Sequence, residues 1–270
     1  MSVQLDQARI AIRERSWLDN LDLALQVIRG HGAAVLASSA LGILPMFLVN
    51  FAITKWLYRD FDEDTRSGYW FLLSLLVMIE APLATAPLTL YLGRALFIDK
   101  PNAREMARNF TSCLPQLLLL QVFLRILFIV PVLTWIVPYA LWPFLNEVIL
   151  LERNPLVSRG ARPSTMKRNS ALHRGGSGDF LLRAIAALAL AGLLIVALVL
   201  TQDFLLENLF GFHPGWTTQI ITLQLALWLV VIYFTVARFL CYLDQRIRDE
   251  GWEVELLLRA ERERLLRHLS

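Results

Sequence analysis

The stretch AIAALALAGLLIVALVLTQ, residues 184–202, decides the fold class because it contains no Asp, Glu, Lys or Arg. A second uncharged block, GHGAAVLASSALGILPMFLVNFAIT, covers residues 30–54. About 20 apolar residues in a helix are enough to cross a hydrocarbon core of roughly 30 Å. Both blocks therefore predict helices that span a membrane.

The composition separates this chain from soluble domains. Of its 270 residues, 56% are hydrophobic and 18% are charged, whereas soluble domains carry nearer a quarter of charged residues. The net charge of +3 would suggest a nucleic-acid partner in a soluble protein. Beside apolar blocks this long, basic residues are better interpreted as topology signals and lipid contacts. The sequence thus predicts an integral membrane protein embedded in the lipid bilayer, with no nucleic-acid partner.

A long apolar segment in the middle of the chain sets the number of spans. Residues 109–146 carry one charge, Arg125, and at about 1.5 Å per residue they are nearly twice as long as one crossing requires. Pro131 and Pro138 supply a turn, because proline interrupts the helical hydrogen-bond ladder. The expected fold is all-α, a polytopic bundle of six spans within residues 33–237. The spans are expected near 33–54, 68–93, 114–133, 135–151, 184–202 and 217–237.

The distribution of basic residues orients these spans. Cytoplasmic loops are enriched in Lys and Arg. With six spans and both termini inside, 22 Lys and Arg face the cytoplasm and three face the outside. Aromatic residues also gather at the expected outer interface, namely Trp56, Tyr58, Tyr69, Trp70, Trp135 and Trp216. The sequence therefore predicts a multi-pass protein of the inner cell membrane with both termini in the cytoplasm.

Two amphipathic helices are expected to flank the spans. Within residues 1–32, Ser16-Trp17-Leu18-Asp19 forms a capping box, which marks the start of a helix. Four apolar residues at helical spacing then predict a stripe that enters the inner leaflet: Leu18, Leu21, Leu25 and Ile28. Residues 238–270 carry acidic and basic residues at i, i+4 spacing. They predict either a solvated cytoplasmic helix or a helix that docks a partner.

Two patterns mimic catalytic or metal sites but lack essential parts. His173-Arg174-Gly175 resembles the first catalytic motif of glycerophosphoryl diester phosphodiesterases, but no Glu-Asn pair and no room for a barrel follow it. Asp60, Asp62 and Asp64 resemble the opening of a calcium loop without its required Gly and Glu. They predict a solvated acidic turn or a weak external cation site. The two cysteines are expected to be free thiols. We therefore expect no metal centre, no cofactor and no enzymatic activity.

The loop between the fourth and fifth expected spans is strongly basic. Residues 153–178 hold six Lys and Arg and no acidic residue. Anionic inner-leaflet lipid attracts such a segment by about 1 kcal/mol per charge near the surface. Topology determination alone explains the charge, and specific binding of lipid or of a partner is the alternative. The candidate lipid contacts are Arg153, Arg159, Arg162, Lys167, Arg168 and Arg174.

Three charged residues fall inside expected spans. They are Glu80 in span 2, Arg125 in span 3 and Glu147 in span 4. A lone charge at mid-bilayer costs about 2.5–3.5 kcal/mol on insertion scales, so intramembrane charges are expected to pair or to serve a function. Glu80 and Arg125 lie at similar expected depth, with Glu147 nearer the cytoplasmic end. The group predicts a structural ion pair, a transport or proton pathway, or a lipid-headgroup site.

Two further stretches carry a family resemblance. They are NEVILLERNP at residues 146–155 and YLDQRIRDEG at residues 242–251. The second is similar to the end of six-helix bacterial membrane proteins related to the membrane domain attached to some glycerophosphoryl diester phosphodiesterases. The resemblance implies a bacterial origin and an accessory role. It implies no catalytic residue, because the catalytic barrel is absent from the sequence.

These observations favour a non-enzymatic membrane protein that acts as a scaffold or regulatory subunit of a membrane assembly. Its basic loop and terminal helices would contact cytoplasmic or membrane partners. The alternative is a small transporter or lipid-handling protein built around Glu80, Arg125 and Glu147. A water-filled cavity at these three residues would favour transport, and a packed, dry group would favour the scaffold. The substrate, the partner and the oligomeric state are not encoded in any recognisable pattern.

Overall fold

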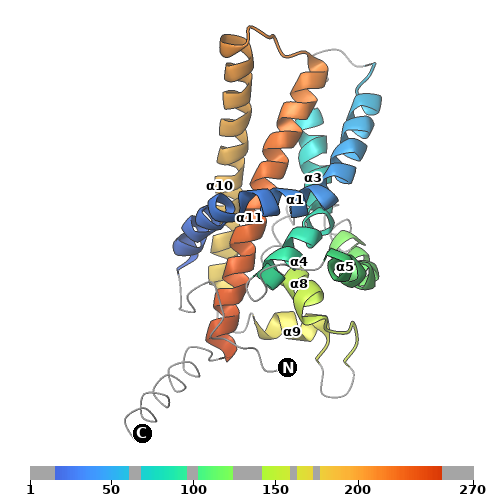
Figure 1. The fold of residues 1–270 in the computed structure, drawn as a ribbon, viewed down its shortest axis with the longest axis vertical. Helices are drawn as coiled ribbons and strands as arrows, with labels where there is room; N and C mark the ends of the chain where they lie inside the picture. Colours follow the sequence, from blue (N-terminus) through green and yellow to red (C-terminus); the bar gives the residue numbers. More distant parts are fainter. Residues whose placement is uncertain are drawn as a thin grey trace, which may run out of the picture.

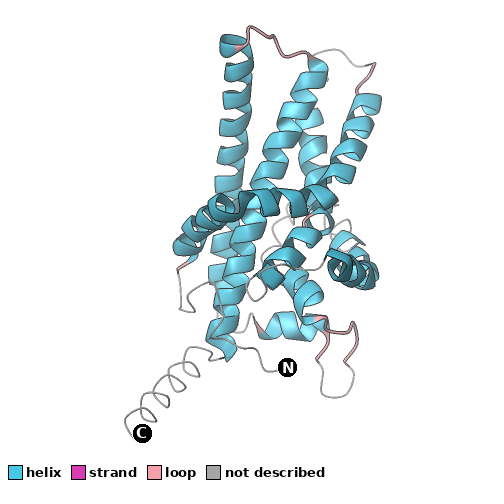
Figure 2. Ribbon diagram, viewed as in Figure 1, coloured by secondary structure: helices cyan, strands magenta, loops and turns pink. Residues whose placement is uncertain are grey.

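A computed structural model of the chain describes residues 16–60, 68–95, 103–123, 142–158, 163–172 and 177–250. In these residues all regular structure is helical, with no strand (Figure 2). Four helical stretches are long and apolar enough to cross a membrane: Trp17–Leu57, Tyr69–Ala95, Gly178–Leu209 and Trp216–Arg248. The prediction of an all-helical membrane protein is therefore confirmed, whereas the finer division into six spans is not.

The described residues contain eight labelled α-helices, three of which continue into π-helical turns. They are α1 (Trp17–Leu57), α3 (Tyr69–Ala84), α4 (Ala86–Ala95), α5 (Ala103–Leu117) with η2 (Leu118–Phe123), α8 (Leu145–Glu147) with η4 (Val148–Glu152), α9 (Thr165–Ala171), α10 (Ser177–Phe204) with η5 (Leu205–Leu209), and α11 (Trp216–Glu250).

Four helices give the molecule its long axis (Figure 1). The end of α1, α3, α10 and α11 run along this axis with alternating directions, and the last turn of α1 lies at the same end as the α10–α11 connection. Three aromatic residues expected at the outer interface meet at this end. The ring of Trp216 packs edge-on against Tyr69 at 4.7 Å and against Tyr58 at 6.4 Å. The helix α9 and the end of α11 lie at the opposite end.

The helix α1 begins as predicted and then bends. The Ser16 and Asp19 side chains each accept from the other residue's backbone N–H, at 3.1 Å, so the capping box is confirmed. The backbone leaves helical geometry at His31. The part before this bend crosses the long axes of α10 and α11 (Figure 1), and the Tyr233 hydroxyl donates to the Leu21 carbonyl at 3.3 Å.

The apolar stripe of this first part is divided between protein and surface. Leu21 is buried and Ile28 packs against the core, whereas Leu18 and Leu25 are exposed. The stripe therefore does not form one lipid-facing surface, because its middle is used to pack against the bundle. The lipid contact expected for the whole stripe stays a prediction for Leu18 and Leu25 only.

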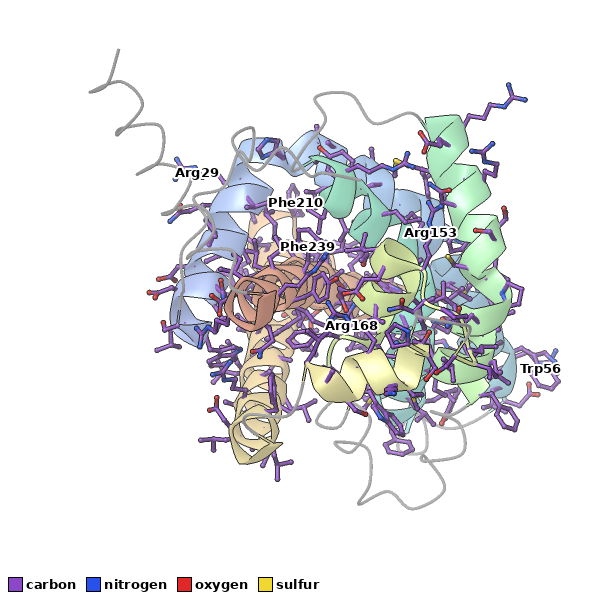
Figure 3. All side chains as sticks on the ribbon, turned by 90° about the horizontal axis from the view of Figure 1, so that it is seen from below. Arg29, Trp56, Arg153, Arg168, Phe210 and Phe239 are labelled. Carbon is purple, nitrogen blue, oxygen red and sulfur yellow. The ribbon has the colours of Figure 1, made fainter. Side chains whose placement is uncertain are left out.

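The described elements between α4 and α10, which are α5–η2, α8–η4 and α9, form a separate layer that we call the inner layer. In Figure 3, which looks along the long axis, α5 lies across that axis. Its buried side chains, Cys113 and Leu117, pack in a cluster with Leu145 and Ile149. The structure thus does not confirm a span at 114–133 or at 135–151, and the turn between them falls outside the described residues.

The two apolar helices near the end of the chain differ in burial. Most side chains of α10 are exposed, as expected for a helix that faces lipid, whereas α11 is the most buried candidate span. The helix α11 also continues without a break from its apolar part to Glu250. The expected boundary between span and charged tail at residues 237 and 238 is therefore not a structural one, and residues 251–270 lie outside the described part.

Candidate functional site

The short helical segment α8–η4 is the most completely buried part of the inner layer. Every residue from Phe144 to Leu150 is buried, including Asn146 and Glu147, which have no exposed surface. A carboxylate in such a place requires a partner, because burying an unpaired charge is costly. That partner is Arg238 of α11, whose Nε donates to Glu147 Oε1 at 2.8 Å. The pair joins the inner layer to the longest buried helix.

Glu152, five residues later, is the centre of a second set of hydrogen bonds. The guanidinium of Arg168 in α9 holds it in a fork, with Nε to Oε2 at 2.8 Å and Nη2 to Oε1 at 3.1 Å. The Tyr242 hydroxyl of α11 donates to Oε1 at 2.8 Å, and the Asn154 amide donates to Oε2 at 3.0 Å. Arg246 lies 3.9 Å away. Forked guanidinium–carboxylate pairs fix orientation as well as contributing energy.

We call Glu147, Arg238, Glu152, Arg168 and Tyr242 the carboxylate network. Its members come from the two stretches NEVILLERNP and YLDQRIRDEG, or lie close to them, apart from Arg168 in the basic loop. Two segments about 90 residues apart in the chain are thereby held together. The carboxylate network holds helical segments in place, since each described contact joins one helix to another.

A loop tip, residues 153–158, follows directly from this network. Arg153 closes η4 in the left-handed conformation, with φ of 52°, which few residues other than glycine adopt. Leu156 and Val157 are exposed, Val157 by 74%. Behind the tip, Gln116 Nε2 donates to Thr165 Oγ1 at 2.5 Å, and Thr165 Oγ1 donates to the Asn154 carbonyl at 2.9 Å. The tip is therefore anchored by α5 and α9.

Glu80 lies in a different polar group. Its Oε2 accepts a hydrogen bond from Asn50 Nδ2 of α1 at 2.9 Å. Asn146 Nδ2 donates to the Pro82 carbonyl at 3.2 Å, which brings α8 to the break between α3 and α4. Glu80 and Glu147 nevertheless have separate partners. Arg125 lies outside the described residues, so the expected Glu80–Arg125 pair stays a prediction.

The candidate lipid contacts have different surroundings. Arg168 is bound to Glu152, whereas Arg153 and Lys167 are exposed. Arg159, Arg162 and Arg174 lie outside the described residues, as does the His173-Arg174-Gly175 motif. Of the six candidates, only Arg153 and Lys167 are therefore shown to be accessible to a ligand.

The acidic turn and the cysteines are the remaining candidate reactive groups. Arg59 donates to both oxygens of Asp60, and this hydrogen bonding lowers the pKa of the Asp60 carboxyl. Asp62 and Asp64 lie outside the described residues. Cys113 and Cys241 are free thiols, as expected. Within the described ranges no three His, Cys, Asp or Glu side chains cluster as metal ligands do.

No family model, curated protein or solved structure matches this chain. Function must therefore be argued from the residues. Sequence reasoning missed Arg238 because it assigned that residue to the cytoplasmic tail, although it is the first basic residue after the apolar block 217–237. It also missed Asn50, although its polar amide side chain stands out within the uncharged block 30–54.

Proposed function

We propose that this chain is a non-enzymatic scaffold or regulatory subunit of a bacterial membrane assembly, and that its loop tip binds a protein partner in the cytoplasm. The observation that carries the proposal is the exposed apolar pair Leu156 and Val157 at this tip. Contiguous apolar surface that is exposed outside the membrane is a feature of interaction sites.

The position of the tip favours a protein over lipid as that partner. In Figure 1 the loop before α9 lies at the end of the molecule opposite the α10–α11 connection, beyond the inner layer. The exposed apolar surface of α10, which suits lipid, extends toward the other end. Arg153 and Lys167 give the tip region positive charge, so the fitting partner presents an apolar patch flanked by acidic residues.

The carboxylate network supports a role in rigid presentation. Before the bend at Arg153, Glu152 is held by α9 and α11, and after the bend Asn154 is held by Glu152 and by Thr165 of α9. A surface that is ordered before binding loses less conformational entropy when the partner docks. This is the property that a scaffold requires, and it needs no reacting group.

The proposed orientation places α9 and the end of α11 in the cytoplasm and the Tyr69–Trp216 contact at the outer face. The excess of basic residues on the proposed inner side supports it. Because α3 and α10 run in opposite directions (Figure 1), residues 96–176 leave and return on the same side. An even number of further crossings in this segment, either none or the two of the six-span division, satisfies that condition, whereas a single crossing does not.

The transporter alternative required Glu80, Arg125 and Glu147 to form one group. The described carboxylates have different partners, Asn50 for Glu80 and Arg238 for Glu147. The described hydrogen bonds therefore do not join Glu80 to Glu147, and the transporter alternative stays a prediction because Arg125 lies outside the described residues. The pairing of Glu147 instead favours a structural role for that carboxylate.

Co-purification from membranes of the native host tests the proposal. The wild-type chain should retain a cytoplasmic or membrane protein in stoichiometric amount, and the double variant Leu156→Ser/Val157→Ser should lose it at unchanged chain abundance. Arg59→Ser, at the opposite end, is the control and should retain it. Solute or ion flux by the purified chain alone in liposomes would contradict a scaffold role.

A further inference from the structure

The interior of the outer half of the bundle contains polar atoms that its own hydrogen bonds do not satisfy. Asn50 and Thr54 are completely buried, and neither Asn50 Oδ1 nor Thr54 Oγ1 has a hydrogen-bond partner within the described residues. They lie four residues apart in α1 and therefore on the same face of the helix. Buried polar atoms are normally paired, so two such oxygens in one turn require an explanation.

The same turn of α1 contacts a carboxylate. Asn50 Nδ2 donates to Glu80 Oε2 at 2.9 Å, so the amide faces Glu80 and its oxygen lies in the same polar group. Among the described residues Glu80 forms no ion pair. A charge within a candidate span is expensive unless a counter-charge compensates it. This face of α1 thus presents two buried neutral oxygens without a partner among the described residues, one of them on the amide that binds the carboxylate of Glu80.

We propose that Asn50, Thr54 and Glu80 bind a small monovalent metal cation, with Na⁺ as the fitting ion. Hard cations are bound by carboxylate, amide and hydroxyl oxygens, which are the groups gathered here. One carboxylate balances one positive charge, so the occupied site is neutral, whereas a divalent ion would leave a net charge in low dielectric. The site would fasten α1 to α3 inside the membrane.

Simpler occupants satisfy only part of the group. A proton on Glu80 neutralises the carboxylate but leaves the orphan oxygens of Asn50 and Thr54 without a common partner. A water molecule can donate to both oxygens but leaves the negative charge uncompensated. A cation answers both requirements. Arg125, outside the described residues, is the competing counter-charge, and the experiment must distinguish it.

Thermal unfolding of the purified full chain in detergent micelles tests the site, with NaCl, KCl and choline chloride compared at equal ionic strength. A ligand that binds only the folded state raises Tm with its concentration. Na⁺ should raise Tm saturably by roughly 5 °C relative to choline, and K⁺ should raise it less. Binding of radioactive Na⁺ to the same preparation gives a second, direct measurement.

Two variants and a control make the test specific. Glu80→Gln should abolish Na⁺ binding, and Thr54→Val, which keeps the side-chain volume, should weaken it at least about tenfold without large loss of Tm in choline. Thr235→Val is the control, because the Thr235 hydroxyl already donates to the Val231 carbonyl at 2.7 Å. It should leave the Na⁺ response unchanged.

Three results would count against the Na⁺ site. An unchanged Tm and no bound Na⁺ in the wild-type chain would overturn the proposal. Stabilisation by low pH alone would assign the site to a proton. Na⁺ binding that appears only in Arg125→Leu would show that Arg125 is the natural counter-charge. None of these outcomes bears on partner binding at the loop tip, so failure here is distinguishable from failure of the scaffold role.

Discussion

The carboxylate of Glu147, which has no exposed surface, accepts a hydrogen bond from Arg238 at 2.8 Å across a separation of 91 residues in the chain. This contact connects the buried segment α8–η4 to α11. Because α11 is also the most buried of the candidate spans, the pair links the inner layer to the membrane bundle.

Removing either partner of this pair should destabilise the protein more than removing both. Glu147→Leu or Arg238→Met leaves an uncompensated charge and should cost about 3–5 kcal/mol, whereas the double variant should recover most of the loss. Unfolding in mixed micelles measures this. The exposed pair Asp179–Arg183 is the control, and Asp179→Asn should cost no more than about 1 kcal/mol. Strictly additive losses in the double variant would show that Glu147 and Arg238 do not interact.

A close contact between α1 and α3 depends on a glycine. A Cβ at Gly42 of α1 would overlap the carbonyl oxygen of Ala84 in α3, which is backbone and cannot rotate away. Gly42→Ala should therefore separate the helices and cost roughly 1–3 kcal/mol. Gly192→Ala in α10 is the control, since nothing lies within 4 Å of its added Cβ, and it should be neutral or slightly stabilising. Equal Tm values for the two variants would exclude the close packing of α1 on α3.

The hydroxyl of Tyr242 should contribute to stability through Glu152. Tyr242→Phe removes a 2.8 Å hydrogen bond to a carboxylate and should cost about 1.5–3 kcal/mol. Tyr91→Phe is the control, because Tyr91 has no side-chain hydrogen bond among the described residues. If the two Phe variants unfolded at the same denaturant concentration, the carboxylate network would not include Tyr242.

Topology can be tested with single cysteines in a background without Cys113 and Cys241. A cysteine at Phe212, exposed in the α10–α11 connection, should react with an impermeant thiol reagent in intact cells. A cysteine at Ser164, the N-cap of α9, should react only after permeabilisation. Strong labelling at Ser164 in intact cells would reverse the proposed orientation or change the number of spans.

Local features were predictable from the sequence because they depend on neighbouring residues. The Ser16–Asp19 capping box and the apolar blocks needed only spacing and composition, and the structure confirms the box and the candidate spans. Tyr69 and Trp216 were expected at one interface from the general preference of aromatic residues for it, and their rings pack against each other.

Pairing over long separations was not predictable in the same way. Glu147 required a cation, but the sequence placed Arg125 at the depth of Glu80 and assigned Arg238 to the tail. The structure shows that α11 continues past its apolar part, which brings Arg238 back toward α8. Residue spacing alone likewise does not tell which residues of the apolar stripe in α1 face lipid and which face protein. Leu21 packs inward, while Leu25 is exposed.

The central claim is that the loop tip binds a cytoplasmic protein, and photo-crosslinking from position 157 in native-host membranes tests it most directly. A photoreactive residue in place of Val157 should give one defined crosslinked protein, and the same residue in place of Phe212, exposed at the opposite end, should not. Absence of any crosslinked protein from position 157, or the same product from both positions, would contradict the proposed scaffold role.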